Sequence, residues 1–300
     1  MLRYNQLNIA EGGPWFGSVA VPGLPTEGVA TPAGRALPKE DIISGISRIG
    51  KTESDENVAL TGGEPLGHPD IGEIAAALRA AGYKRILART DGRRLADTDF
   101  LASVLMAGVS LFEVMMSERA EKSRSLRGLK NVRRISECEK LFANVYLSVV
   151  VPVGRDNYEG LIGSLDSVLR MVEVDRVVFC WGEPGFPIWQ AGENIQKAIE
   201  FCGVKRVWAV TRGIPACVAP EAAPHIEEMF DVGPQERLLR IPPVCAGCSL
   251  HGLCARMPGT DLNYSWEPKP IAGNRHSPFV NDILEKGFVF DKENARLYGK

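Results

Sequence analysis

The chain has 300 residues, 45% of them hydrophobic and 24% charged, with a formal net charge of -2 at pH 7. This composition is typical of a globular protein with a buried core, and it excludes a disordered chain or a fibre. So small a charge gives no overall attraction to nucleic acid or anionic lipid, and we expect neither as a partner. No apolar run is long enough to span a membrane and no secretory signal is visible, which predicts a cytoplasmic protein.

Short apolar runs alternate with segments of helical periodicity from about residue 39 onward. The predicted strands are 57–60, 85–88, 111–116, 145–151, 176–181 and 206–210. The predicted helices are 39–49, 71–81, 97–106, 135–142, 158–172 and 189–201. This alternation predicts an α/β fold in which helices cover a parallel sheet, either open or nearly closed into a barrel. Sites on such sheets lie where the strands end, so we expect function in the loops that follow the strands.

The alternation ends near residue 212, beyond which Pro and Cys become frequent and only 221–230 keeps a helical pattern. We therefore expect four regions along the chain. They are an N-terminal extension (1–27), a β/α domain (28–211), a small cysteine-rich domain (212–265) and a C-terminal tail (266–300).

Seven cysteines are distributed unevenly, with none before Cys138. Four of them form a candidate metal site with the pattern C-x2-C-x5-C and one preceding thiol: Cys217, Cys245, Cys248 and Cys254. Four thiolates can saturate a zinc ion or hold one iron–sulfur cluster, and ligation would stabilise a segment with little core of its own. The spacing leaves the choice between zinc and iron–sulfur open. The three other cysteines lie in or beside apolar stretches and are interpreted as buried small residues.

A Gly-Gly-Glu-Pro run, Gly62 to Pro65, follows the strand at 57–60. Two adjacent glycines let the backbone approach a ligand closely. Glu64 at the strand end can accept hydrogen bonds from an ammonium group. The alternative is a tight strand-to-helix turn without a ligand. His68, beside this run, is the one histidine of interest, and a turn residue is its expected role.

These loops resemble motifs of the radical S-adenosylmethionine (SAM) superfamily. Thr61 to Ile71 looks like the second-strand motif, whose glycine-rich loop receives the methionine part of SAM in that superfamily. Thr90-Asp91-Gly92 resembles the third-strand motif, which usually reads Thr-Asn-Gly, and Asn157 is similar to an asparagine near bound SAM. The resemblance implies a partial (β/α)6 barrel with a small C-terminal metal-binding domain. It also implies these SAM-binding residues: Gly62, Gly63, Glu64, Pro65, Thr90, Asp91 and Asn157.

The cysteine-rich segment is similar to the auxiliary domain called twitch or SPASM. That resemblance implies one auxiliary [4Fe-4S] cluster, with zinc as the alternative metal. The reactive cluster of the superfamily is instead held by C-x3-C-x2-C after the first strand. The corresponding loop should fall within 29–43, which contains no cysteine, and one register places Ala36, Glu40 and Ile43 at the ligand positions. A single carboxylate cannot hold that cluster, so the usual reductive cleavage of SAM is not expected.

Two possible functions follow from this resemblance and from the absence of the C-x3-C-x2-C motif. The first is a binding or accessory subunit in a biosynthetic or peptide-modification pathway, with a precursor peptide or a partner biosynthetic enzyme as its partner. The second is an enzyme that binds SAM and carries out polar group transfer. A zinc-stabilised β/α-barrel enzyme of unrelated chemistry is a further alternative.

Basic residues gather at 119–134 and at Arg89, Arg93 and Arg94. They predict either a basic rim that receives an acidic peptide or phosphate, or an ordinary solvated face.

Overall fold

A computed structural model describes residues 5–8, 37–48, 57–61, 64–116, 124–138, 145–182, 186–226, 243–248, 254, 288–291 and 296–299. Seven strands form one sheet: β1 (Asn5–Asn8), β2 (Asn57–Thr61), β3 (Arg85–Thr90), β4 (Val109–Met115), β5 (Tyr146–Val153), β6 (Arg176–Trp181) and β7 (Trp208–Arg212). The helices are α1 (Lys39–Arg48), α2 (Ile71–Ala80), α3 (Thr98–Met106), α4 (Arg124–Cys138), α5 (Leu161–Leu169) and α6 (Gly192–Val204). Two further strands, β8 (Phe288–Asp291) and β9 (Arg296–Gly299), pair antiparallel with each other.

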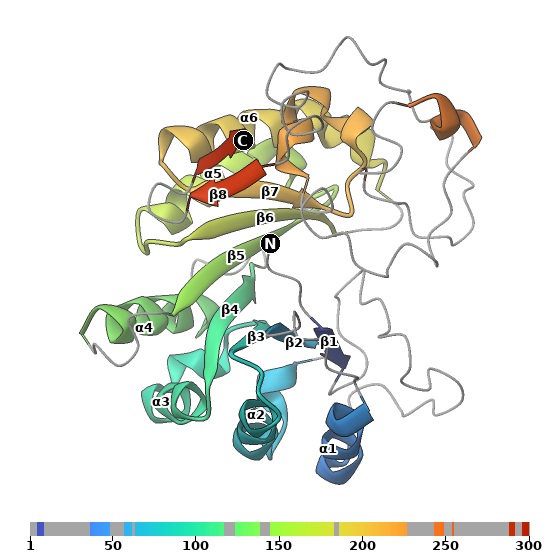
Figure 1. Cartoon of the computed structure of the whole chain (residues 1–300). Helices are drawn as coiled ribbons and strands as arrows, with labels where there is room; N and C mark the ends of the chain where they lie inside the picture. Colours follow the sequence, from blue (N-terminus) through green and yellow to red (C-terminus); the bar gives the residue numbers. More distant parts are fainter. Residues whose placement is uncertain are drawn as a thin grey trace. The chain divides into compact units, whose positions relative to one another are not determined.

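The order of the seven strands in the sheet follows their order in the chain (Figure 1). The pairs β1–β2, β2–β3, β3–β4, β4–β5 and β6–β7 are all parallel. A sequential order of parallel strands is the topology of a β/α barrel, whereas the strand order of a doubly wound sheet reverses. The predicted α/β fold of partial-barrel type is therefore confirmed.

The chain divides into two compact units, each with its own apolar core. One comprises residues 2–150 and 168–174, and the other comprises residue 1, 151–167 and 175–300. In the first unit α1, α2 and α3 lie side by side (Figure 1), and Ile74 and Leu78 of α2 are fully buried. One sheet face in this unit carries a cluster of Ala59, Leu87 and Leu111.

The second unit contains most of α5 together with α6, β6 and β7. Its fully buried side chains include Phe179 of β6, Val210 of β7 and Ile195 of α6. Burial of such side chains supplies most of the favourable free energy of folding. Among the described residues, no helix is long and apolar enough to cross a membrane.

Several elements differ from the sequence prediction. Strand β1 was not expected, and it pairs with β2 from Asn5↔Val58 to Asn8↔Thr61. Its sequence, Asn-Gln-Leu-Asn, has no apolar run that would predict a strand. Because β1 lies within the expected N-terminal extension, that region contributes directly to the sheet.

Helix α4 begins eleven residues before the predicted helix at 135–142, of which residues 139–142 lie outside the described residues. The apolar positions of this helix, Leu126, Leu129 and Val132, are separated by many cations. The helical periodicity was therefore not recognised in the sequence. Near the end of the second unit, the predicted helix at 221–230 is a short 3-10 turn over Pro220–His225, and 227–230 lie outside the described part of the chain.

Candidate functional site

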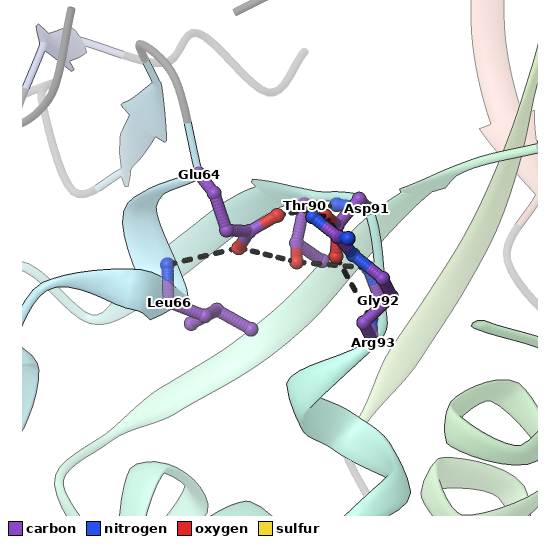
Figure 2. Close-up of polar contacts among 6 residues, drawn as sticks. All are labelled: Glu64, Leu66, Thr90, Asp91, Gly92 and Arg93. Carbon is purple, nitrogen blue, oxygen red and sulfur yellow. Dashed lines mark hydrogen bonds and ion pairs between the residues drawn. The ribbon is translucent and has the colours of Figure 1, made fainter. Parts of the chain in front are cut away.

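The carboxylate of Glu64 connects the loop after β2 to the loop after β3 (Figure 2). Its Oε1 accepts hydrogen bonds from the Thr90 hydroxyl at 2.6 Å and from the Leu66 amide at 3.1 Å. Its Oε2 accepts a hydrogen bond from the Asp91 amide at 2.6 Å. The side chain expected to face an ammonium group is thus already bound by three donors of its own chain.

The two loops have local reasons for this geometry. Glu64 is the N-cap of a 3-10 turn, Pro65–Gly67, in which the first residue is a proline that needs no amide partner. In the loop after β3, the Gly92 amide donates to the Thr90 hydroxyl at 3.0 Å, and Gly92 has φ +73°, a conformation that favours glycine. The Asp91 carboxylate accepts hydrogen bonds from the amide and the guanidinium of Arg93.

Burial raises the pKa of Glu64 to about 7. The hydrogen bonds from Thr90 and Asp91 to the ionised form oppose this increase, and the Asp91 carboxylate adds to it. Near neutral pH the side chain is therefore poised between its charged and neutral forms. A carboxyl group in this state can hold or release a proton at a strand end, which is the property of a general acid or base.

His68 is buried beside this cluster and joins it to the start of α1. Its Nδ1 accepts a hydrogen bond from the Asp70 amide at 3.0 Å, so the ring hydrogen lies on Nε2 and is donated to the Leu37 carbonyl at 2.8 Å. This is the turn-stabilising role expected for this histidine.

A largely buried ion pair on the adjacent strands was not expected from the sequence. Arg89 of β3 and Glu113 of β4 occupy paired positions, and Arg89 Nε lies 2.9 Å from Glu113 Oε2. The Glu113 side chain is 1% exposed and that of Arg89 is 13% exposed. Next in register on β5 is Ser148, which is also buried. A charged residue within an apolar strand run was the available signal for this pair.

The three arginines at and after the end of β3, which the sequence offered as part of a basic rim, all have partners within the chain. Arg89 is largely buried and pairs with Glu113, and Arg93 is paired with Asp91. Arg94 donates to the Leu66 carbonyl at 2.7 Å and stacks over the ring of Phe100. These three cations support the fold around the site.

The structure brings four of the predicted SAM-site residues together: Glu64, Pro65, Thr90 and Asp91. Gly62 and Gly63 lie outside the described residues. Asn157 belongs to the second compact unit, where its Oδ1 accepts from the Gly154 amide and its Nδ2 donates to the Pro152 carbonyl. Its contacts are those of a residue that stabilises the turn after β5.

The four predicted metal ligands are partly buried, and none forms a disulfide. The amide of Cys248 donates to the carbonyl of Cys245 at 2.9 Å, and burial together with the nearby Cys248 raises the pKa of Cys245. Cys254 Sγ accepts from the amide of Ala216, the residue before Cys217, at 3.3 Å. Within the part of the chain that the structure describes, no three side chains are arranged as a metal site.

No protein-family model matches the sequence. The chain is 36% identical over 95 residues to the human protein "Molybdenum cofactor biosynthesis protein 1", a match that covers 31% of this chain and 14% of that protein. Among solved structures it is similar to SuiB of Streptococcus suis. SuiB bound to the precursor peptide SuiA matches with 14% identity and a TM-score of 0.48, over 71% of this chain and 49% of SuiB.

SuiB bound to S-adenosylmethionine matches with 15% identity and a TM-score of 0.46, over 61% of this chain and 44% of that one. The chain thus spans less than half the length of each of these proteins, and the comparisons do not assign it to a family.

Proposed function

We propose that this protein is a radical-SAM-type protein without the reactive cluster, which acts as a binding or accessory subunit in a biosynthetic or peptide-modification pathway. The observation that carries the proposal is a combination of two features. The Glu64 bridge preserves an ordered site at the ends of β2 and β3, while no cysteine precedes Cys138 in the whole sequence.

A polar site at the carboxyl ends of parallel strands is where β/α proteins bind their ligands. The side-chain atoms at this site that could contact a ligand are mostly oxygens, and they include the carboxylates of Glu64 and Asp91. Such a site suits a cationic group such as an ammonium or a sulfonium. Because Glu64 already accepts three hydrogen bonds, such a ligand would use the remaining acceptor capacity of its carboxylate and that of Asp91. The local identity to the human molybdenum cofactor biosynthesis protein is consistent with a biosynthetic role.

We also propose that Cys217, Cys245, Cys248 and Cys254 hold one auxiliary [4Fe-4S] cluster, with zinc as the alternative. Four thiols fit either group by their chemistry. The Ala216 amide that donates to Cys254 Sγ supports this assignment, because amide hydrogen bonds to sulfur are a common second shell of thiolate ligands. A bound cluster would supply electron transfer or structural stabilisation.

The test of this proposal is anaerobic purification followed by counting of iron, sulfide and zinc, with SAM and a strong reductant then added to the same sample. We expect about one cluster per chain and no 5′-deoxyadenosine. Cys217→Ser should lose the metal, whereas Cys202→Ser, at a fully buried thiol on α6, should retain it. If the reduced protein formed 5′-deoxyadenosine from SAM as fast as its iron was reduced, the proposal would be contradicted.

A second candidate, a SAM-binding enzyme with polar chemistry, is favoured by the elevated pKa of Glu64. A group that titrates near neutral pH can exchange a proton with a substrate during group transfer. Calorimetric titration with SAM distinguishes this candidate. It predicts binding that is weakened in Glu64→Gln and unchanged in Glu221→Gln, a matched change at an exposed glutamate. The absence of heat at millimolar SAM would exclude it.

A further inference from the structure

The exposed face of α4 carries a line of four cations, which we call the basic stripe: Arg124, Arg127, Lys130 and Arg134. At a rise of 1.5 Å per residue, the stripe extends about 15 Å along the helix. It lies opposite the buried face, which is formed by Ser125, Leu126, Leu129 and Val132. The cations are therefore directed away from the core of their unit.

The stripe is unfavourable for the helix itself. Arg124, Arg127 and Lys130 follow one another at spacings of three residues, so neighbouring positive charges repel each other. Arg124 and Arg127 also occupy the first turn, where the helix dipole is positive and where α4 has no acidic residue. Helix stability therefore does not account for this arrangement.

Helix α6 shows the usual alternative within the same chain. There the exposed Lys197 pairs with Glu193 four residues earlier, at 2.6 Å. The stripe differs, because none of its four cations has an ion pair with any residue that the structure describes. The nearest carboxylate on the helix is Glu137, at its C-terminal end beside Arg134.

Helix α4 is attached directly to the loop of the candidate site. Gly128 lies so close to the Gly92 carbonyl that a side chain at this position would overlap with it. The Asn131 amide group donates to the carbonyls of Leu95 and Ala96, at 3.2 and 3.0 Å, in the turn that follows the same loop. A partner bound along the stripe would thus be held next to the loop that binds Glu64.

We propose that the basic stripe is a docking surface for an acidic segment of a polypeptide. The identity of this segment rests on the proposed function, under which the segment is part of the precursor peptide. Carboxylates placed along an extended or helical peptide can match cations spaced at about 5 Å along a helix. Nucleic acid is the less suitable partner, because α4 has no aromatic residue on which a base could stack and the whole chain is slightly acidic.

The experiment measures fluorescence anisotropy of a labelled poly(Glu-Gly) peptide with the full-length protein, at low and at physiological salt. A poly(Gln-Gly) peptide tests the requirement for charge, and poly-uridine RNA of equal length tests the competing partner. The stripe variant is Arg127→Glu/Lys130→Glu. Its control is Lys84→Glu/Lys197→Glu, which makes the same charge change at exposed positions elsewhere.

We expect the acidic peptide to bind, the affinity to fall with salt, and the stripe variant to bind about tenfold or more weakly than the control. The stripe variant also places a glutamate in the first turn of α4 and puts negative charges three or four residues from Arg124 and Arg134. These attractions offset the repulsion between the two new glutamates, so the thermal midpoint of the variant should equal or exceed that of the wild type. This second readout separates a lost contact from a failure to fold.

Equal affinities of the two double variants, or tighter binding of the RNA than of the peptide through the same residues, would overturn the docking surface. The peptide measurement needs neither SAM nor reductant. Formation of 5′-deoxyadenosine together with stripe-dependent peptide binding would therefore overturn the proposed function and support the docking surface.

Discussion

Replacement of Glu64 by glutamine tests the electrostatics of the site most directly. In the folded protein the pKa of Glu64 is raised from its ordinary value of 4.5 to about 7. Below pH 4.5 the carboxyl group is neutral in both the folded and the unfolded chain. As the pH increases to 7, the unfolded chain releases this proton and the folded chain retains it, so the stability contributed by Glu64 is lost.

The difference in pKa corresponds to about 3 kcal/mol in the free energy of unfolding, because each pKa unit is worth about 1.4 kcal/mol. Urea unfolding of the wild type and of Glu64→Gln, measured between pH 4.5 and 8, gives this quantity as a difference. We expect the stability of the wild type relative to the variant to decrease by about 3 kcal/mol over this range. Glu221→Gln, at an exposed carboxylate, should show no such trend.

The opposite result would refute the reasoning. If the wild type gained stability relative to Glu64→Gln as the pH increased, the hydrogen bonds from Thr90 and Asp91 would outweigh the cost of burying the charge. The pKa of Glu64 would then lie below its ordinary value. A role of Glu64 as a proton donor or acceptor near pH 7 would be excluded with it.

Three further predictions concern packing and burial in the two compact units. Gly128→Ala should destabilise the protein by about 1–3 kcal/mol in urea unfolding through overlap with the neighbouring loop, whereas Gly163→Ala, at an open position of α5, should stabilise it by up to about 1 kcal/mol. Glu113→Ala should cost about 3–5 kcal/mol because it leaves Arg89 buried without its carboxylate, and the double variant Arg89→Met/Glu113→Leu should recover most of that loss. Cys202, whose pKa burial raises to about 12, should remain unmodified by a thiol reagent until the protein unfolds, as mass spectrometry can show.

The strands of the sheet were predictable because each is a short apolar run that ends in a polar loop. The runs at Asn57–Thr61 and Tyr146–Val153 consist mostly of apolar residues that pack on both faces of the sheet. The strand Asn5–Asn8 lacked this signal, since its place in the sheet depends on backbone pairing with β2. Backbone pairing leaves little trace in a short polar sequence.

The candidate site was predictable in composition and not in its contacts. The sequence placed Glu64, Thr90 and Asp91 at the ends of neighbouring strands, which the structure confirms. It could not indicate that the glutamate accepts its hydrogen bonds from the other two residues, because such contacts depend on rotamers and loop geometry. The Arg89–Glu113 pair was missed for a related reason, since a charged residue is normally expected at the surface.

The contact between α4 and the loop after β3 has a mechanical consequence. Side chains that interdigitate can change rotamer and absorb a displacement, but Gly128 meets the Gly92 carbonyl without an intervening side chain. A force that shifts this helix by a fraction of an ångström should therefore be transmitted to the peptide group of Gly92. We expect the amide resonance of Gly92 to move when the acidic peptide is added, and a resonance that stays fixed would show that the helix and the loop respond independently.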